Sequence, residues 1–80
     1  MKTVKMFDFY EEGIADALEK ADVEDEFYDY EELKNDTAIP WYIVSEEEAK
    51  NYGAFHVVVD KVLREAGCKT GEKVFIWISW

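Results

Sequence analysis

The chain has 80 residues, of which 49% are hydrophobic and 16% aromatic, and its 19 acidic and 9 basic side chains give a formal net charge of −10. This length suffices for one small domain, predicted over residues 1–80, and the aromatic content argues against a disordered acidic tail. The negative charge disfavours direct binding to nucleic acid and to anionic lipid, and it favours a basic partner.

The excess charge lies in one continuous block, from Asp8 to Asp36. This block holds 13 acidic side chains and only two basic ones, Lys20 and Lys34, so that its net charge is −11. The remaining residues carry six acids and seven bases, a net charge of +1. Any function based on charge is therefore expected in this block.

Cysteine content and hydropathy predict where the chain resides. The single cysteine, Cys68, cannot form an internal disulfide, so no oxidising compartment is needed and the cytoplasm is expected. No apolar run approaches the roughly 18 residues of a membrane span, and no basic-then-apolar leader opens the sequence. We therefore expect a soluble protein without a membrane partner.

The N-terminal third predicts a strand followed by a helix. Residues 3–7 alternate and are rich in strand formers, which indicates a first strand ending near Asp8. Asp8 suits a helix N-cap, with Glu11 as its capping-box partner. In the helix that follows, an apolar face and an opposite acidic stripe are expected. The apolar face comprises Ile14, Ala17, Leu18 and Ala21, and the stripe comprises Glu12, Asp16 and Glu19.

Residues 22–33 fit two structures. Val23, Phe27 and Tyr30 would share one face of a helix, whereas residues 27–30 also alternate as a short strand with both tyrosines on one side. We predict the strand, over roughly 26–33. A turn at 34–36 and a second β-rich run at 38–44 follow, with Pro40 near its start, where a missing backbone donor is tolerated.

The C-terminal half predicts one long helix and a last strand. Ser45 and Glu48 form a capping box, and three acids in the first turn complement the helix dipole. The helix is expected to run to about Ala66 and to end at Gly67. Its apolar face comprises Tyr52, Phe55, Val59, Val62, Leu63 and Ala66, and residues 74–80 form the last strand.

The order strand, helix, strand, strand, helix, strand predicts an α+β fold of ferredoxin-like βαββαβ type. In this fold, two helices cover one face of a four-stranded antiparallel sheet. If Val74, Ile76 and Ile78 face the helices, Phe75 and Trp77 lie on the open face, together with Tyr42, Tyr28 and Tyr30. Without basic residues or an RNA-binding signature, such a face is better suited to a protein interface or a homodimer.

Catalytic and metal-binding motifs are not found. The spacing of Asp22, Glu24 and Glu26 resembles the start of a calcium loop, but the required glycine and the closing glutamate are missing. His56 has no second histidine or serine nucleophile beside it in the sequence, and Cys68 follows a helix end as an ordinary thiol. We therefore expect no catalytic residue, no metal, no cofactor and no enzymatic activity.

The acidic block has two interpretations. A row of acids is most often a solvated face that keeps a protein soluble. Alternatively, one helical turn advances about 5.4 Å, within about 2 Å of the phosphate spacing along a DNA strand, so acids on a helix can imitate a phosphate rail. The predicted contacts with a basic partner are Glu12, Asp16, Glu19, Glu24, Asp25, Glu26, Asp29, Glu31 and Glu32, with Tyr28 and Tyr30 as anchors.

In size, in acidity and in its lack of catalytic groups, the chain resembles small acidic proteins of phages and mobile elements, which include anti-CRISPR proteins and other DNA mimics. The resemblance is one of character and rests on no shared motif. It implies inhibition by occupancy, with the acidic residues covering the nucleic-acid site of a CRISPR effector or of another DNA-processing enzyme. The alternative is a small interaction or ligand-binding module that uses the aromatic sheet face.

Overall fold

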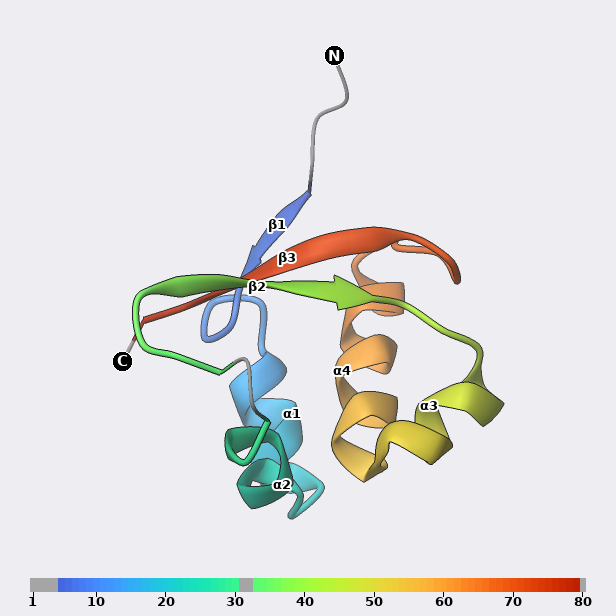
Figure 1. Ribbon diagram of the computed structural model, residues 1–80, viewed down its shortest axis with the longest axis horizontal. Coiled ribbons are helices and arrows are strands. Elements are labelled where there is room, and N and C mark those ends of the chain that lie inside the picture. The colour runs from blue at the N-terminus through green and yellow to red at the C-terminus, as the bar shows by residue number, and fades with distance from the viewer. Residues whose placement is uncertain (1–4, 31–32, 80) are drawn as a thin grey trace.

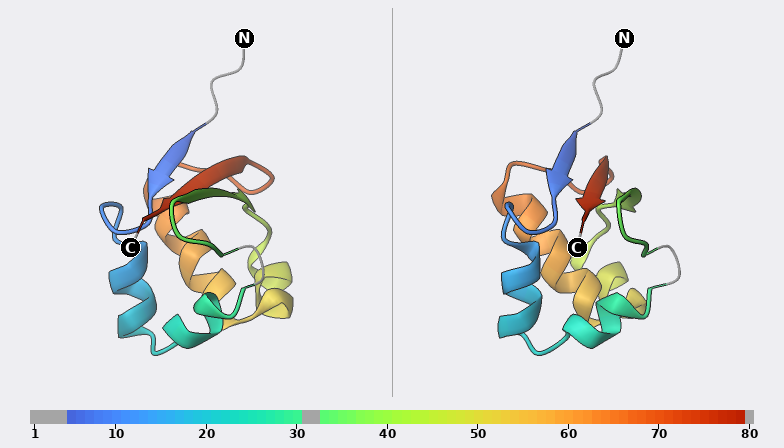
Figure 2. Two further views of the ribbon diagram at one scale, coloured as in Figure 1. Left: turned by 60° about the vertical axis from the view of Figure 1, so that its left-hand side comes forward. Right: turned by 90° about the vertical axis from the view of Figure 1, so that its left-hand side faces the viewer.

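A computed structural model describes residues 5–30 and 33–79. Its described elements form a small α+β domain with two layers, a three-stranded mixed sheet and four helices that all pack on one side of that sheet (Figures 1 and 2). The strands are β1 (Met6–Asp8), β2 (Thr37–Tyr42) and β3 (Lys73–Ile78). The helices are α1 (Ile14–Lys20), α2 (Glu24–Tyr28), α3 (Glu46–Tyr52) and α4 (Ala54–Glu65).

The sheet has the order β1-β3-β2, with β3 parallel to β1 and antiparallel to β2. The α+β class is confirmed, but the four-stranded antiparallel ferredoxin-like arrangement is wrong. The missing strand is the one predicted over 26–33, where the structure has helix α2; residues 31–32 lie outside the described part. Residues 3–4 and 80 of the predicted first and last strands also lie outside it.

Packing of Phe27 explains why this segment is helical. Its ring is fully buried and lies against Phe9, with ring centroids 5.0 Å apart, and against Phe55 at 6.0 Å. Val23 and Tyr30 pack beside it on the core, as the helical interpretation requires. In a strand, Phe27 would share its face with Asp29, which would bring a charged group to the core. Tertiary packing of the aromatic residue therefore overrides the local alternation.

The first helix begins later than predicted because Phe9 enters the core. The Asp8 carboxylate accepts hydrogen bonds from the backbone N–H groups of Tyr10 and Glu11, both at 2.9 Å, and so caps a turn and not a helix. The chain leaves this turn through Gly13, at φ 89°, and α1 starts at Ile14. Glu12 consequently lies outside α1, and the predicted helical stripe through Glu12, Asp16 and Glu19 is not formed.

The predicted long helix is divided in two at Gly53. The Ser45 N-cap is confirmed at its start, where the Ser45 hydroxyl accepts a hydrogen bond from the Glu48 N–H at 3.2 Å. Gly53 has φ 132° and ψ 163°, a conformation that neither helix can contain, so α3 and α4 meet there at an angle (Figure 1). This break sets α3 apart from α4 and places Tyr52 over the first turn of α4.

Candidate functional site

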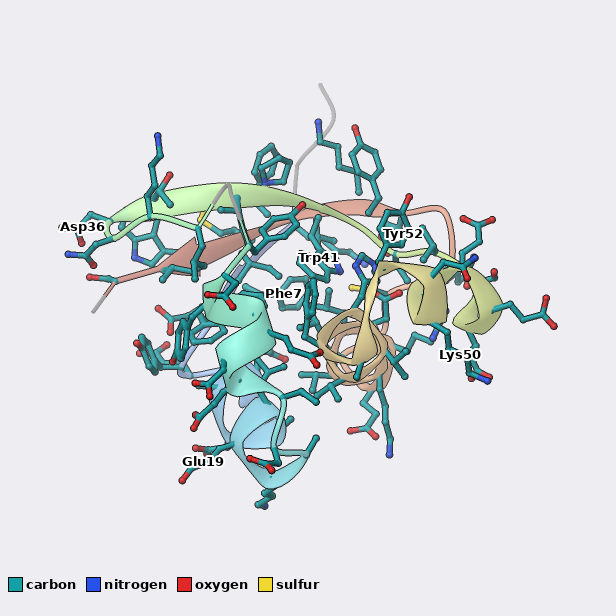
Figure 3. All side chains as sticks on the ribbon, turned by 60° about the horizontal axis from the view of Figure 1, so that its bottom comes forward. Phe7, Glu19, Asp36, Trp41, Lys50 and Tyr52 are labelled. Atoms are coloured by element: carbon teal, nitrogen blue, oxygen red, sulfur yellow. The ribbon has the colours of Figure 1, made fainter. Side chains whose placement is uncertain are left out.

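The predicted acidic contacts lie on the outer side of α1 and α2. Ile14 and Leu18 bury one side of α1, so Asp16 and Glu19 are exposed on the other, and the Glu19 side chain points away from the molecule (Figure 3). On α2, Phe27 takes the buried side. The acids Asp25 and Glu26 of α2 are exposed, as is its C-cap residue Asp29, whereas Glu24 is half-buried.

Acids from both helices converge on Tyr28. Burial raises the pKa of the Tyr28 phenol, and Tyr10 together with the carboxylates of Glu24, Asp25 and Glu19 raises it further. A carboxylate has this effect only at short range, so Glu19 of α1 and two acids of α2 share one surface. We call this group, Glu19, Glu24 and Asp25 around Tyr28, the acidic surface.

Within the described ranges 5–30 and 33–79, no acid of the acidic surface forms an ion pair, although Lys20 follows Glu19 in the last turn of α1. The close pairs of acidic and basic groups found there are Lys5 with Glu72, at 3.0 Å, and His56 with Asp60, at 3.3 Å, and the second is an ion pair only when His56 is protonated. Neither includes an acid of α1 or α2. The negative charge of this surface is therefore left for water, salt ions or a partner to compensate.

Other predicted contact residues lie elsewhere or are not described. Glu12 lies in the turn before α1, where its charge contributes to the raised pKa of Cys68, a rise caused first by burial. The ring of Tyr30 faces inward, with its centroid 5.9 Å from that of Trp41 and 6.0 Å from that of Phe55. Glu31 and Glu32 lie outside the described residues. The structure thus brings together only part of the predicted set.

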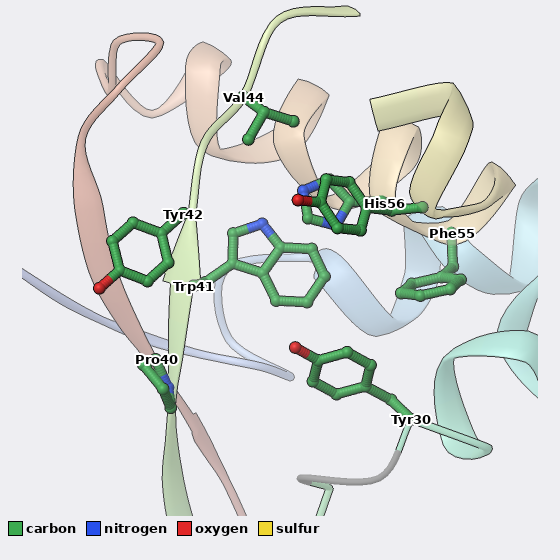
Figure 4. A pocket seen from close by; sticks show the side chains of 8 residues that line it. Tyr30, Pro40, Trp41, Tyr42, Val44, Phe55 and His56 are labelled. Atoms are coloured by element: carbon green, nitrogen blue, oxygen red, sulfur yellow. The ribbon is translucent and has the colours of Figure 1, made fainter. Parts of the chain in front are cut away.

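An aromatic pocket was not foreseen from the sequence. It has a volume of about 360 Å³ and lies between β2, the end of α3 and the start of α4 (Figure 4). Its lining residues come from four separate segments of the chain: Tyr30, Pro40, Trp41, Tyr42, Val44, Tyr52, Phe55 and His56. Tyr52 at the end of α3 stacks on His56 of α4 across the break at Gly53.

A buried polar network supports this pocket from below. Asp60 is fully buried and accepts hydrogen bonds from the Trp41 indole N–H at 2.8 Å and from the Val44 N–H at 3.3 Å. The Val44 carbonyl in turn accepts a hydrogen bond from Arg64. Burial raises the pKa of Asp60, and the hydrogen bond from Trp41 opposes the rise. Asp60 therefore fixes the Trp41 ring in one orientation.

His56 stacks between two aromatic rings. Its ring centroid lies 4.3 Å from that of Trp41 and 4.9 Å from that of Tyr52, with interplanar angles of 23° and 25°. Its Nε2 atom is 3.3 Å from Asp60 Oδ1, but it makes no hydrogen bond of good geometry within the described structure. Burial lowers the pKa of His56. The sequence analysis did not use the one signal for this network, which is that His56 and Asp60 are four residues apart in a largely apolar helix and so lie on the same side of it.

The open face of the sheet carries exposed apolar side chains, as predicted. Val74, Ile76 and Ile78 are fully buried under the helices, whereas Trp77 and Tyr42 are exposed on the other face, Trp77 at 36% and Tyr42 at 56%. Lys73 lies over the rings of Tyr42 and Phe75, 5.3 and 5.4 Å from their centroids. Tyr28 and Tyr30 belong to the helical layer, so their predicted place on this face is wrong.

The described residues contain no group of three or more His, Cys, Asp or Glu side chains arranged to hold a metal ion. None of their helices is long and apolar enough to cross a membrane.

Comparison with protein-family models, with curated proteins and with solved structures finds no match. The function is therefore inferred from the residues and their geometry.

Proposed function

We propose that the chain is a non-enzymatic inhibitor that covers a basic nucleic-acid-binding site on another protein with the acidic surface of α1 and α2. The observation that carries this proposal is the convergence of Glu19, Glu24 and Asp25 around Tyr28, with no ion pair to any of the three among the described residues. Like charges held close together destabilise a folded chain, and a basic groove would relieve that repulsion. The partner is a DNA-processing or defence enzyme of the kind that DNA mimics and anti-CRISPR proteins block.

Tyr28 supports the same proposal. Its side chain is 44% exposed in the centre of the acidic surface, and its ring contacts those of Phe9 and Phe27 at centroid distances of 6.5 and 6.2 Å. A tyrosine anchored on the core loses little conformational entropy on binding, and tyrosine is enriched among interface residues. Tyr28 thus supplies apolar contact area that charge alone does not.

The decisive experiment is competition with DNA. A partner captured by the immobilised chain is purified, and its binding to duplex DNA is measured with and without the chain. We expect mutual exclusion, because both ligands would occupy one basic site. A partner that binds DNA and the chain simultaneously would contradict the proposal.

The chain offers a matched control for this experiment. The variant Glu19→Gln/Glu24→Gln/Asp25→Asn removes three charges from the acidic surface, and Glu46→Gln/Glu47→Gln/Glu48→Gln removes three from the first turn of α3. The two variants have the same net charge. We expect the first to weaken partner binding at least about tenfold and the second to change it little. If both variants lost the same amount of binding affinity, the overall charge of the chain, and not the acidic surface, would explain the effect.

A second candidate function uses the open sheet face. Met6 is 59% exposed there, beside Phe75 on the neighbouring strand, and Tyr42 and Trp77 add further exposed area. Exposed aromatic side chains of this kind favour a protein interface. The variant Tyr42→Ala/Trp77→Ala would abolish binding if this face is the contact, and the triple variant of the acidic surface would then bind normally.

A further inference from the structure

The walls of the aromatic pocket are rings inclined to one another. The ring plane of Tyr30 is inclined by 53° to that of Trp41 and by 58° to that of Phe55, and the planes of Trp41 and Phe55 are inclined by 69° to each other. The ring centroids are 5.9 to 6.3 Å apart. Tyr52, exposed at 61%, supplies a further ring, whereas the ring of Tyr42 lies on the other side of β2 from Trp41 (Figure 4). The rings of Tyr30, Trp41 and Phe55 contact one another and together line one side of the pocket of about 360 Å³.

The chemistry of the lining limits what this space can hold. Its eight described residues include no carboxylate, carboxamide, lysine or arginine. The Trp41 N–H is already donated to Asp60, which is fully buried, and His56 Nε2 is itself buried below the surface. A ligand with many hydrogen-bonding groups would leave them unsatisfied there, at a cost in binding free energy.

Charge complementarity favours a cation. The faces of aromatic rings attract positive charge, and the net charge of −10 attracts cations toward the protein. A primary ammonium or a guanidinium carries several N–H donors that need acceptors, and the described lining offers few side-chain acceptors besides tyrosine hydroxyls. A quaternary ammonium has no N–H group, and its methyl groups can pack directly against rings.

We propose that the pocket formed by Tyr30, Trp41, Tyr52, Phe55 and His56 is a binding site for a quaternary ammonium group. The volume of about 360 Å³ is at the small end for ligand sites, which suits a headgroup or the end of a side chain. Trp41 and Phe55 form the deep part of the site, and Tyr52 closes one side of its mouth. The site is separate from the acidic surface, so it does not depend on the function proposed above.

The test compares choline chloride with 3,3-dimethylbutan-1-ol, in which carbon replaces the quaternary nitrogen and the shape is unchanged. Binding is followed by NMR through the indole N–H signal of Trp41, and the signal of Trp77 on the open sheet face serves as an internal reference. Sodium chloride at equal concentration controls for ionic strength. We expect choline to shift the Trp41 signal in a saturable manner and the neutral isostere to bind about tenfold more weakly.

Two variants make the result specific. Tyr52→Leu removes an exposed ring from the pocket and should weaken choline binding severalfold, whereas Trp77→Leu should leave it unchanged. Because Tyr52 is largely exposed, its loss should not unfold the protein. Equal affinity for the two probes would overturn the proposal in favour of a neutral apolar site, and a choline response no larger than that of sodium chloride would overturn it altogether.

Discussion

Asp60 shows at the level of one residue how the pocket is held in shape. Its carboxylate is fully buried and accepts hydrogen bonds from Trp41 and from the backbone of Val44. Removing it leaves the buried Trp41 N–H and the partly buried Val44 N–H without acceptors, and a buried donor without a partner costs about 1–3 kcal/mol. We therefore expect Asp60→Ala to lower the free energy of unfolding by about 2–4 kcal/mol, measured by urea denaturation.

Two variants serve as controls for this prediction. Asp60→Asn keeps one oxygen acceptor and should cost less than Asp60→Ala. Asp16→Ala, on the exposed side of α1, should stay within about 0.5 kcal/mol of the wild type. Equal stability of Asp60→Ala and the wild type would mean that the network does not hold Trp41.

His56 predicts a pH dependence with a definite sign. Burial lowers its pKa, against the opposing influence of Asp60 and the Tyr42 backbone. Between the folded-state pKa and the unfolded value of about 6.5, the unfolded chain binds more protons. The contribution of His56 to stability is therefore complete above about pH 6.5 and is lost as the pH falls through the folded-state pKa.

Asp60 has the opposite sign, because burial raises its pKa and its contribution grows as the pH falls through the raised value. Comparing the wild type with His56→Phe tests the histidine while the ring stack is kept. The variant also frees Asp60 from the influence of His56, which lowers the Asp60 pKa, and this change acts in the same direction. On going from pH 7 to pH 5, the wild type should lose stability relative to the variant. A difference in unfolding free energy that stays constant would refute the assignment.

At the level of elements, Gly53 is the position where the sequence pattern misleads. The apolar periodicity from Tyr52 to Ala66 is continuous, so it predicts one helix, although a glycine lies within the predicted span. The break depends on the conformation of Gly53 and on the packing of the Phe55 ring beside it, and neither is encoded in the periodicity. A Cβ atom at this position would lie 2.9 Å from the Phe55 ring.

Gly53→Ala should therefore destabilise the protein through both strain and steric overlap, by about 1–3 kcal/mol or more. Gly67 is a matched control, because it also has a positive φ, 101°, but its Cβ would meet no atom within 4 Å. We expect thermal unfolding to show the larger loss for Gly53→Ala. Equal losses would mean that the contact with Phe55 carries no energetic cost.

The other elements show what local patterns can and cannot predict. β2, β3 and the Ser45 cap followed from alternation and capping chemistry, because these signals are local. The helix α2 did not, because its conformation is decided by the burial of Phe27 against Phe9 and Phe55, which are distant in sequence. The aromatic pocket was missed for the same reason, since its rings come from segments that only the tertiary fold brings together.

At the level of the whole molecule, charge is distributed unequally. The acids of α1 and α2 lie in the helical layer (Figure 3), and exposed apolar side chains lie on the open face of the sheet. The sequence predicted an acidic block, but it placed the second half of that block in a strand of the sheet, where the structure has helix α2. It did not predict which acids meet, because Glu19 approaches Glu24 and Asp25 only through the packing of α1 against α2.

Uncompensated charge predicts that salt stabilises the fold. Raising the ionic strength from about 0.01 to 0.15 M shortens the Debye length from about 30 to 8 Å and screens the repulsion within the acidic surface. We expect the melting temperature to rise by a few degrees, and to rise less in Glu19→Gln/Glu24→Gln/Asp25→Asn. A melting temperature that falls on adding salt would indicate that ion pairs, and not repulsion, dominate.

The central claim is that the acidic surface of α1 and α2 binds a basic partner. The most direct test is the salt dependence of the affinity for the captured partner, measured for the wild type and for the two triple variants. We predict a steep decrease of the wild-type affinity with increasing salt, a shallower one for Glu19→Gln/Glu24→Gln/Asp25→Asn, and a wild-type slope for Glu46→Gln/Glu47→Gln/Glu48→Gln. An affinity that is independent of salt, or that changes identically in all three proteins, would contradict the claim.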